Sequence, residues 1–205
     1  MAELGIQYKY PWIYGLSIKI IHRGPVLKEF KKQVGEHVSV FDVAAGFGNM
    51  AHFIDDSNTY SGIDLNQTYV EYAQRHGLNV QIGDIFDGRA YRPHEVTMLV
   101  DVVHHMPEGT LKILFDNVFK NTRKRVVILE PAFLNLEERY GRVARPIDWA
   151  LRKLDGDGVN TIERWYSEKE YLDLFETKFS SVQGRPFTVH VLKIYPYFIV
   201  TYTRA

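Results

Sequence analysis

The sequence contains no cysteine. This absence excludes disulfide bonds, cysteine-ligated zinc and thiol nucleophiles, and it fits a reducing cytoplasm, where we expect the chain to reside. No apolar run approaches the roughly 20 residues that a transmembrane helix needs. The first apolar stretch, from Trp12 to Ile21, is broken by polar residues and lacks the basic lead and cleavage site of a secretory signal. We therefore expect a soluble protein.

The chain also lacks an excess of charge of either sign, with 25 Lys and Arg against 25 Asp and Glu. Without a global field to attract nucleic acid, a polyanionic partner would need a local basic patch, and no RNA-binding module is recognisable. Length and hydrophobic content, 205 residues and 45%, suit one domain with a sizeable core. No internal repeat or linker divides the sequence, so we expect a single domain over residues 1–205.

Short β-branched runs alternate with longer helical stretches, which predicts an α/β fold with a parallel sheet covered by helices on both faces. The helical stretches are expected at 49–54, 66–76, 107–121 and 167–178. The strands are expected at 38–43, 60–63, 80–82, 96–100 and 125–129, and near the end of the chain at 179–182 and 194–203.

Two segments lie outside this alternation. Residues 1–35 are predicted to form an N-terminal helix, either covering a sheet edge or closing as a lid over a ligand, with Tyr10 and Tyr14 on its aromatic stripe. Residues 134–165 are predicted to form a helical insertion after the fifth strand. The basic residues of the insertion, among them Arg145, form either a solvated helix face or a site for an anionic acceptor or anionic lipid.

The most informative segment is VFDVAAGFGNMA, residues 40–51, in which a strand ends in a tight Gly-x-Gly turn before a helix. Glycine permits a positive φ and a close approach of ligand to backbone. The spacing Gly46-x-Gly48-x-x-Ala51 fits the relaxed dinucleotide fingerprint, and Asp64 lies near the position of a ribose-binding acid. It equally fits other nucleoside ligands, so spacing does not decide between them.

Asp42, late in the strand before the loop, favours a ligand without phosphate. A carboxylate beside a pyrophosphate would be electrostatically unfavourable. S-adenosylmethionine carries an ammonium, a sulfonium and one carboxylate. An acid near the loop can face its cationic side, while loop amides take its carboxylate.

Acidic residues also end the next strands, at the carboxyl edge where open α/β sheets bind ligands. Asp64 can accept hydrogen bonds from both ribose hydroxyls, and Asp84 can accept one from the adenine amino group. Each acid alone could be a helix cap or a turn former. Four of them, counting Asp42 and Asp101, at four successive strands favour a binding site.

The segments VFDVAAGFGNM, GIDLN, IGDIFD, VTMLVDVVHHM and VVILEP, between Val38 and Pro131, resemble the successive motifs of class I S-adenosylmethionine-dependent methyltransferases, in their small-molecule branch. Ala44 and Ala45 stand where that family usually has glycine and cysteine. The resemblance implies a doubly wound seven-stranded sheet, mostly parallel with an antiparallel last strand. The predicted cofactor-binding residues are Asp42, Ala44, Gly46, Gly48, Asp64, Leu65, Gly83, Asp84, Ile85 and Asp101.

Two residues are candidates for catalysis, His104 after the fourth strand and Glu130 at the end of the fifth. Either could serve as a base, and either could be structural; methyl transfer needs a base only if the acceptor must lose a proton. The adjacent pair His104 and His105 is a poor metal site, so we expect no metal. The predicted acceptor is a small or lipid-like molecule, contacted by Tyr10, Tyr14, His104 and Arg145.

The sequence leaves two other functions open. One is a nicotinamide-dependent oxidoreductase with a Rossmann fold, which Asp42 disfavours. The other is a methyltransferase-like subunit that binds the nucleoside without activity.

Overall fold

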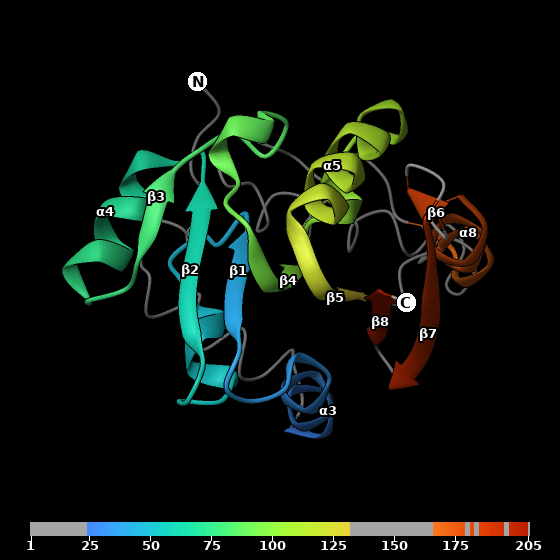
Figure 1. The fold of residues 1–205 in the computed structure, drawn as a ribbon, viewed down its shortest axis with the longest axis horizontal. Coiled ribbons are helices and arrows are strands. Elements are labelled where there is room, and N and C mark those ends of the chain that lie inside the picture. The colour runs from blue at the N-terminus through green and yellow to red at the C-terminus, as the bar shows by residue number, and fades with distance from the viewer. Residues whose placement is uncertain (1–23, 132–165, 179–180, 183–184, 195–196, 205) are drawn as a thin grey trace, which may run out of the picture.

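The computed structural model describes residues 24–131, 166–178, 181–182, 185–194 and 197–204. Strands and helices alternate through most of this range (Figure 1). The helices are α3 (Gly24–Val34), η1 (Asn49–Phe53), α4 (Gln67–Arg75), η2 (Gly88–Ala90), η3 (Val103–His105), α5 (Glu108–Asn121), α8 (Glu168–Leu172) and the π-helix η5 (Asp173–Lys178). The strands are β1 (Ser39–Val43), β2 (Thr59–Asp64), β3 (Val80–Ile82), β4 (His94–Val100), β5 (Thr122–Pro131), β6 (Ser181–Val182), β7 (Arg185–Ile194) and β8 (Tyr197–Arg204).

The strands of the described residues follow the order β3-β2-β1-β4-β5-β8-β7-β6. Strands β1 to β5 pair in parallel, β8 runs antiparallel between β5 and β7, and the two-residue β6 pairs only with β7. Seven principal strands, of which the last in sequence is antiparallel, confirm the predicted fold class. The chain leaves β1 in one direction through β2 and β3 and returns to β4 on the other side, which creates a topological switch point between β1 and β4.

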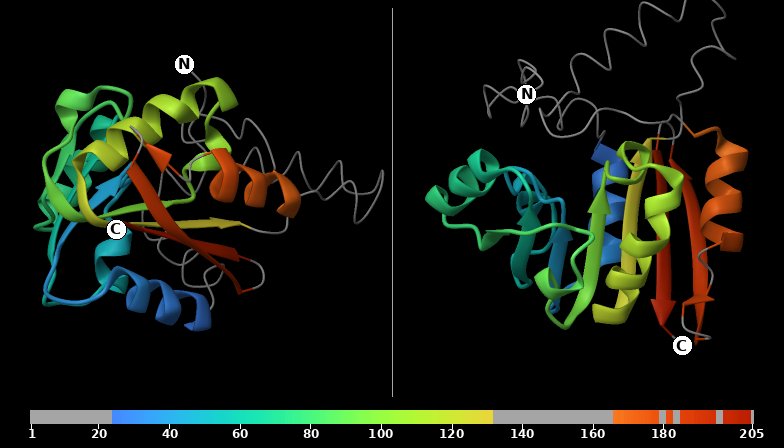
Figure 2. Two further views of the ribbon diagram at one scale, coloured as in Figure 1. Left: turned by 45° about the vertical axis from the view of Figure 1, so that its right-hand side comes forward. Right: turned by 90° about the horizontal axis from the view of Figure 1, so that it is seen from above.

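Helices pack on both faces of the sheet (Figure 2). Alternate residues of one strand reach different cores: Met98 of β4 joins α3 and η1, while Leu99 joins α5 and α8. Both core clusters contain side chains without exposed surface, among them Phe30 of α3 and Leu114 of α5. Because the central strands are buried on both faces, they read as near-continuous apolar runs.

Most predicted elements are confirmed, with two corrections. Strand β5 runs from Thr122 to Pro131 and is longer at both ends than the predicted 125–129, since Glu130 and Pro131 still pair with β8. The strand predicted at 194–203 is found as β8, Tyr197–Arg204, but the preceding strand β7, Arg185–Ile194, which pairs with it in antiparallel, was not predicted. Strand β7 alternates β-branched with polar and charged side chains, and this weaker apolar signal hid it.

Helix α8 begins at the predicted cap. The side chain of Ser167 accepts a hydrogen bond from the Glu170 amide, and the Glu170 side chain accepts one from the Ser167 amide, so both halves of a capping box are present. The helix then widens into the π-helix η5, which ends at Lys178.

Of the predicted N-terminal helix, the structure describes the part from Gly24 onward. This part is α3, whose Val26, Phe30 and Val34 are fully buried against the sheet. The remainder of residues 1–35, and the predicted insertion at 134–165, lie outside the described residues.

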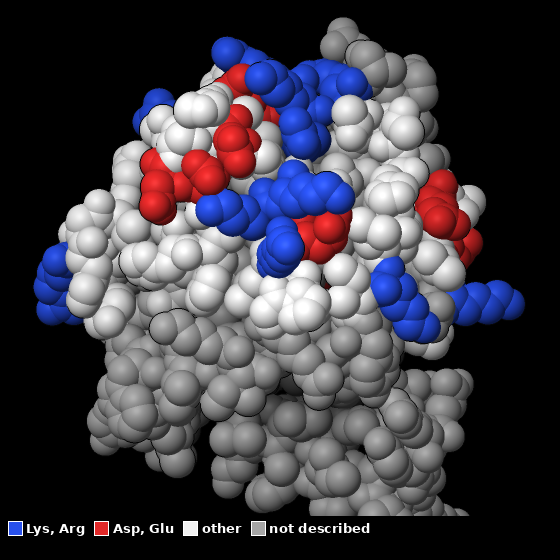
Figure 3. All heavy atoms as spheres, turned by 90° about the horizontal axis from the view of Figure 1, so that it is seen from below, with Lys and Arg blue, Asp and Glu red and all other residues white. Residues whose placement is uncertain are grey.

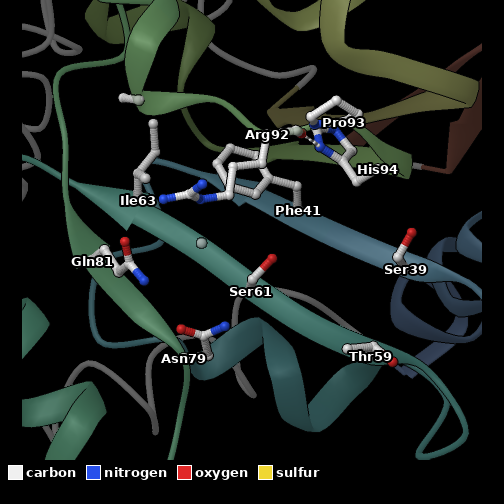
Figure 4. A pocket seen from close by; sticks show the side chains of 12 residues that line it. Ser39, Phe41, Thr59, Ser61, Ile63, Asn79, Gln81, Arg92, Pro93 and His94 are labelled. Carbon is white, nitrogen blue, oxygen red and sulfur yellow. Dashed lines mark hydrogen bonds between the residues drawn. The ribbon is translucent and has the colours of Figure 1, made fainter.

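The connection from β3 to β4 holds only the one-turn helix η2, and it leaves part of one sheet face uncovered. A hollow of about 240 Å³ lies there, lined by polar residues such as Ser61 of β2, Gln81 of β3 and the preceding Asn79, with Arg92 above it (Figure 4). These side chains are solvated, and the hollow lies on the face of the sheet, not at the strand ends. It is separate from the site described below.

Basic and acidic side chains alternate over the face shown in Figure 3. Several of the described ones form ion pairs, including Lys31 with Asp55 and Lys124 with Glu95. This mixture gives that face no uniform basic field. Among the described helices, none is long and apolar enough to span a membrane.

Candidate cofactor and catalytic site

The candidate site lies at the carboxyl ends of β1 and β4, on either side of the switch point. Each strand is followed by a residue other than glycine in the left-handed region: Ala44, with φ 60°, after β1 and Asp101, with φ 56°, after β4. A left-handed Ala costs about 1–2 kcal/mol, while Asp tolerates this conformation better. Strained backbone of this kind clusters at functional sites.

The loop after β1 alternates in hand, because Gly46 and Gly48 also have positive φ. Its amides already donate within the protein: Ala45 to the Ile63 carbonyl, Gly46 to Asp64, and Gly48 to the Ala45 carbonyl. The direction in which a Gly46 side chain would point is open toward the described residues, none of which has an atom within 4 Å. The loop therefore offers a ligand space beside Gly46, while the amides of Ala45, Gly46 and Gly48 are already used within the protein.

Asp64 closes this loop from the end of β2. Its Oδ2 accepts the Gly46 amide at 2.8 Å, and its Oδ1 accepts the Asn66 amide at 2.8 Å, one residue before α4. Both oxygens of the carboxylate thus accept backbone amides that shape this edge of the sheet. Gly62, which sequence reasoning missed, lets the loop lie close to β2, because a Cβ at Gly62 would lie only 2.8 Å from the Cβ of Ala45.

Asp42 lies under the same loop and is 2% exposed. Its Oδ2 accepts a hydrogen bond from the Tyr60 hydroxyl at 2.8 Å. Burial raises the pKa of the Asp42 carboxyl to about 7; the Tyr60 hydrogen bond lowers it in part, and the nearby Asp64 carboxylate raises it further. Within the described part of the chain, no basic side chain forms an ion pair with Asp42.

An apolar surface lies beside the loop at the ends of β2 and β3. Leu65 is 53% exposed and Ile82 is 54% exposed, and the neighbouring strand residue Asp64 pairs with Ile82. Among the described large hydrophobic side chains, only Ile113 of α5 is comparably exposed. Two exposed apolar side chains at adjacent strand ends suit a flat, partly apolar ligand such as a nucleobase.

The remaining predicted residues of this region have mixed placements. Gly83 donates its amide to the Asp64 carbonyl, which ties the end of β3 to that of β2. Asp84 is exposed and accepts the Phe86 amide in a turn. Ile85 is buried in the core, and its carbonyl accepts the hydroxyl of Tyr91. Ile85 therefore has little exposed surface with which to contact a ligand.

His104 and Glu130, separated by 26 positions, meet in the structure. The Nδ1 of His104 lies 2.8 Å from Oε2 of Glu130, and both side chains are almost fully buried. Glu130 Oε1 accepts the amides of Val102 at 2.8 Å and Val103 at 2.7 Å. The carboxylate thus fixes both the His104 ring and the backbone turn that carries it.

A fourth donor reaches Glu130 from α8. The Tyr171 hydroxyl lies 3.2 Å from Oε2, and the ring is buried, stacked on Phe175. Sequence reasoning missed Tyr171 and Tyr60, because neither belongs to a motif and each meets its carboxylate only after folding. A tyrosine at a strand or helix position reads from sequence as core.

Three predicted substrate contacts, Tyr10, Tyr14 and Arg145, lie outside the described residues. No group of three or more His, Asp or Glu side chains among the described residues could hold a metal ion.

No family model matches the sequence, and no curated protein matches it. Solved structures do match its fold. An O-methyltransferase family protein from Burkholderia thailandensis aligns with a TM-score of 0.65 and 11% identity over 97% of this chain and 62% of that one. Human N-acetylserotonin methyltransferase, solved with S-adenosylmethionine, aligns at 0.65 and 17% over 97% of this chain and 56% of that one.

The chain thus spans about three fifths of the length of these two proteins. Magnesium protoporphyrin IX methyltransferase from Synechocystis, solved with S-adenosylhomocysteine, aligns at 0.61 and 13% over 100% of this chain and 90% of that one. At these identities the likeness concerns the fold. The chain therefore has the fold of S-adenosylmethionine-dependent methyltransferases.

Proposed function

We propose that the chain binds S-adenosylmethionine and transfers its methyl group to a small-molecule or lipid-like acceptor. The observation that carries the proposal is the loop from Ala44 to Gly48, which closes on Asp64 at the switch point and leaves open space beside Gly46. The fold supports it, because the solved neighbours include methyltransferases with this cofactor or its demethylated product.

The residues present fit the cofactor from end to end. The open space beside Gly46 suits the amino-acid part, and the buried charge of Asp42 suits its cationic side. Asp64, at the end of β2, is an acid of the kind that can accept hydrogen bonds from ribose hydroxyls. Exposed Leu65 and Ile82 suit the faces and edge of adenine. The sequence predicted that loop amides take the carboxylate of the cofactor, but the amides of Ala45, Gly46 and Gly48 donate within the protein, so we assign the loop a mainly steric part.

Bound S-adenosylmethionine would supply an electrophilic methyl group, whose bonding electron pair returns to sulfur on transfer. The protein must then align an acceptor and exclude water. If the acceptor atom carries a proton, we assign its removal to His104. Hydrogen bonding of Nδ1 to Glu130 selects the tautomer with its lone pair on Nε2. Glu130 is then a positioning residue, because all its described contacts are within the protein.

A nicotinamide dinucleotide fits this site poorly. Its pyrophosphate would lie at the loop, within range of the buried Asp42 carboxylate, which forms no ion pair among the described residues. Two like charges in a region of low dielectric repel strongly. The amides of Ala45, Gly46 and Gly48, which would be needed to hold phosphate, already donate within the protein.

Ligand binding separates these alternatives. Isothermal titration with S-adenosylhomocysteine should give a dissociation constant in the micromolar range, whereas NADH should give no heat. Absence of any heat or melting shift with S-adenosylhomocysteine at millimolar concentration would sink the proposal. Transfer of a radiolabelled methyl group from S-adenosylmethionine into fractionated cell extract then separates an enzyme from an inactive binding subunit, and the labelled fraction gives the class of acceptor.

A matched pair of glycine variants tests the loop itself. Gly46→Val should abolish binding, because valine fills the open space and disfavours φ 55°. Gly77→Val is the control: Gly77 also has a positive φ, 78°, and open space around it, but it follows α4. If both variants fold and bind alike, the loop is not the contact surface.

A further inference from the structure

The hollow on the face of the sheet is built by three strands in register (Figure 4). Phe41 of β1 pairs with Ser61 of β2, and Ile63, two residues further along β2, pairs with Gln81 of β3. Because side chains alternate in direction along a strand, these four lie on one face. The opposite face of β3 is covered by α4, whereas the connection from β3 to β4 holds only the one-turn helix η2. The hollow of about 240 Å³ therefore follows from this short connection.

Several side chains around the hollow carry hydrogen-bonding groups that the described residues do not use. They are the hydroxyl of Thr59, the amides of Asn79 and Gln81 and the guanidinium of Arg92. The Ser61 hydroxyl forms one long bond, of 3.3 Å, to a backbone carbonyl. Figure 4 shows Asn79, Gln81 and Arg92 pointing into the hollow from different sides. Polar groups that converge on a concavity are typical of a ligand site.

Arg92 brings a positive charge to the hollow, and no acidic side chain among the described residues lines it. Within the described part of the chain Arg92 forms no ion pair, unlike Arg89 of the same connection, which pairs with a carboxylate at 2.8 Å. Glu95, which contacts Ser39 at the border of the hollow, is itself paired with Lys124 at 2.6 Å. One uncompensated positive charge among neutral donors is complementary to an anion.

The backbone that carries Arg92 is anchored by a buried histidine. Burial lowers the pKa of His94 to about 4, so its ring is neutral at pH 7 and has one N–H. The ring donates from Nδ1 to the Arg92 carbonyl at 2.5 Å, because a carbonyl can only accept. Its Nε2 accepts the Thr97 hydroxyl at 2.5 Å, and the ring stacks on Phe41. This part of the hollow is therefore fixed before a ligand arrives, which lowers the cost of binding.

We propose that the hollow is a second ligand site, which binds a small hydroxylated phosphate ester such as a sugar phosphate. The Arg92 guanidinium pairs with the phosphate, and the amides of Asn79 and Gln81 donate to its remaining oxygens. A carboxylate, with two oxygens, would be satisfied by the guanidinium alone, so the additional donors favour a phosphate. The hydroxyls of Thr59 and Ser61 suit the hydroxyl groups of the ligand, since each can donate and accept.

This site goes beyond the proposed function and does not rest on it. The hollow lies on the face of the sheet, while the loop of Gly46 closes on Asp64 at the end of β2. Both ligands should therefore bind at the same time.

Isothermal titration with ribose 5-phosphate tests the site, with ribose and inorganic phosphate as matched probes. Ribose 5-phosphate should bind about tenfold more tightly than inorganic phosphate, because it adds hydroxyl contacts, and ribose should bind weakest, because it lacks the charge. Equal affinity for ribose 5-phosphate and either probe would overturn the inference, as would absence of heat with ribose 5-phosphate at millimolar concentration.

Prior addition of S-adenosylhomocysteine separates the two sites. The affinity for ribose 5-phosphate should stay unchanged, and competition between the two ligands would place the sugar phosphate in the cofactor site and overturn the inference. Failure of S-adenosylhomocysteine to bind would instead reject the proposed function.

A matched pair of arginine variants locates the ligand. Arg92→Gln should weaken binding of ribose 5-phosphate about tenfold or more, because it removes a charge-assisted hydrogen bond. Arg89→Gln removes the same charge from the same connection and should leave the affinity within about twofold of wild type, since Arg89 is already paired at the surface. Both side chains are exposed, so both variants should melt near the wild-type temperature. Equal losses of affinity in the two variants would indicate a general surface attraction and overturn the inference.

Discussion

Two buried carboxylates at the same edge of the sheet have opposite surroundings. Glu130, at the end of β5, accepts four hydrogen bonds, two from backbone amides and one each from His104 and Tyr171. Asp42, near the end of β1, accepts one from Tyr60. Both are almost inaccessible to solvent. The difference teaches that burial alone does not identify a ligand site: Glu130 has four described donors that tie it to its turn, while Asp42 has one described donor.

The largest expected effect is at Glu130. Glu130→Leu should lower the free energy of unfolding by about 3–5 kcal/mol, because it leaves the amides of Val102 and Val103 without acceptors in the core. Urea unfolding measures this loss. A cost below about 1 kcal/mol would show that Glu130 is not the anchor of this turn.

Asp42→Asn should raise the free energy of unfolding at high pH, in contrast to Glu130→Leu. An unfolded carboxyl ionises near its ordinary value of 3.8, and the folded one near 7, so ionisation favours unfolding more and more as pH rises between these values. The difference between these two pKa values lowers the free energy of unfolding of the wild type by roughly 4 kcal/mol at pH 8. The buried amide offsets part of this, so we expect a gain of about 2–3 kcal/mol.

The control for Asp42→Asn is pH. Below about pH 3 both the folded and the unfolded carboxyl hold most of their proton, so the stabilisation relative to wild type should nearly vanish there. Urea unfolding of both proteins at pH 8 and at pH 3 gives the comparison. A gain that is the same at both values would contradict the raised pKa of Asp42.

Tyr→Phe at Tyr60 and at Tyr171 tests whether Asp42 and Glu130 differ in the number of hydrogen bonds that each accepts. Tyr60→Phe at pH 8 should cost about 1–2 kcal/mol, since it removes the described donor to an ionised group. Tyr171→Phe should cost about half as much, because Glu130 keeps three donors. At pH 5, where Asp42 is neutral, the cost of Tyr60→Phe should shrink and that of Tyr171→Phe should not. Thermal unfolding at both pH values provides the measurement.

The smallest expected effect is at Ala44, which tests whether strain near Asp42 is real. Ala44→Gly relieves a left-handed alanine worth about 1–2 kcal/mol, while glycine adds about 0.5–1 kcal/mol of unfolded-state entropy. We expect a net gain of up to about 1 kcal/mol in chemical unfolding. The matched control is Ala51→Gly, because Ala51 lies in η1 without a positive φ and should lose stability on the same substitution.

The sequence by itself determined most of the helices and strands, and it predicted a ligand site at the carboxyl edge of the sheet. Short β-branched runs, turn residues and the cap residue Asn66 mark local structure, and these signals act over a few residues. The Gly-x-Gly turn and the acids after successive strands point to the carboxyl edge of the sheet, because parallel strands align their ends there.

Tertiary structure alone decided which of these acids is saturated. The donors to Glu130 come from positions 28, 27, 26 and 41 residues away. Tyr60 reaches Asp42 from the neighbouring strand, β2. Tertiary structure also decided that Gly62 leaves room for Ala45 of the loop and that the Gly46 amide donates to Asp64. It likewise decided that β7 and β8 form separate, paired strands. Each of these depends on contacts between segments distant in sequence, and local periodicity carries no record of such contacts.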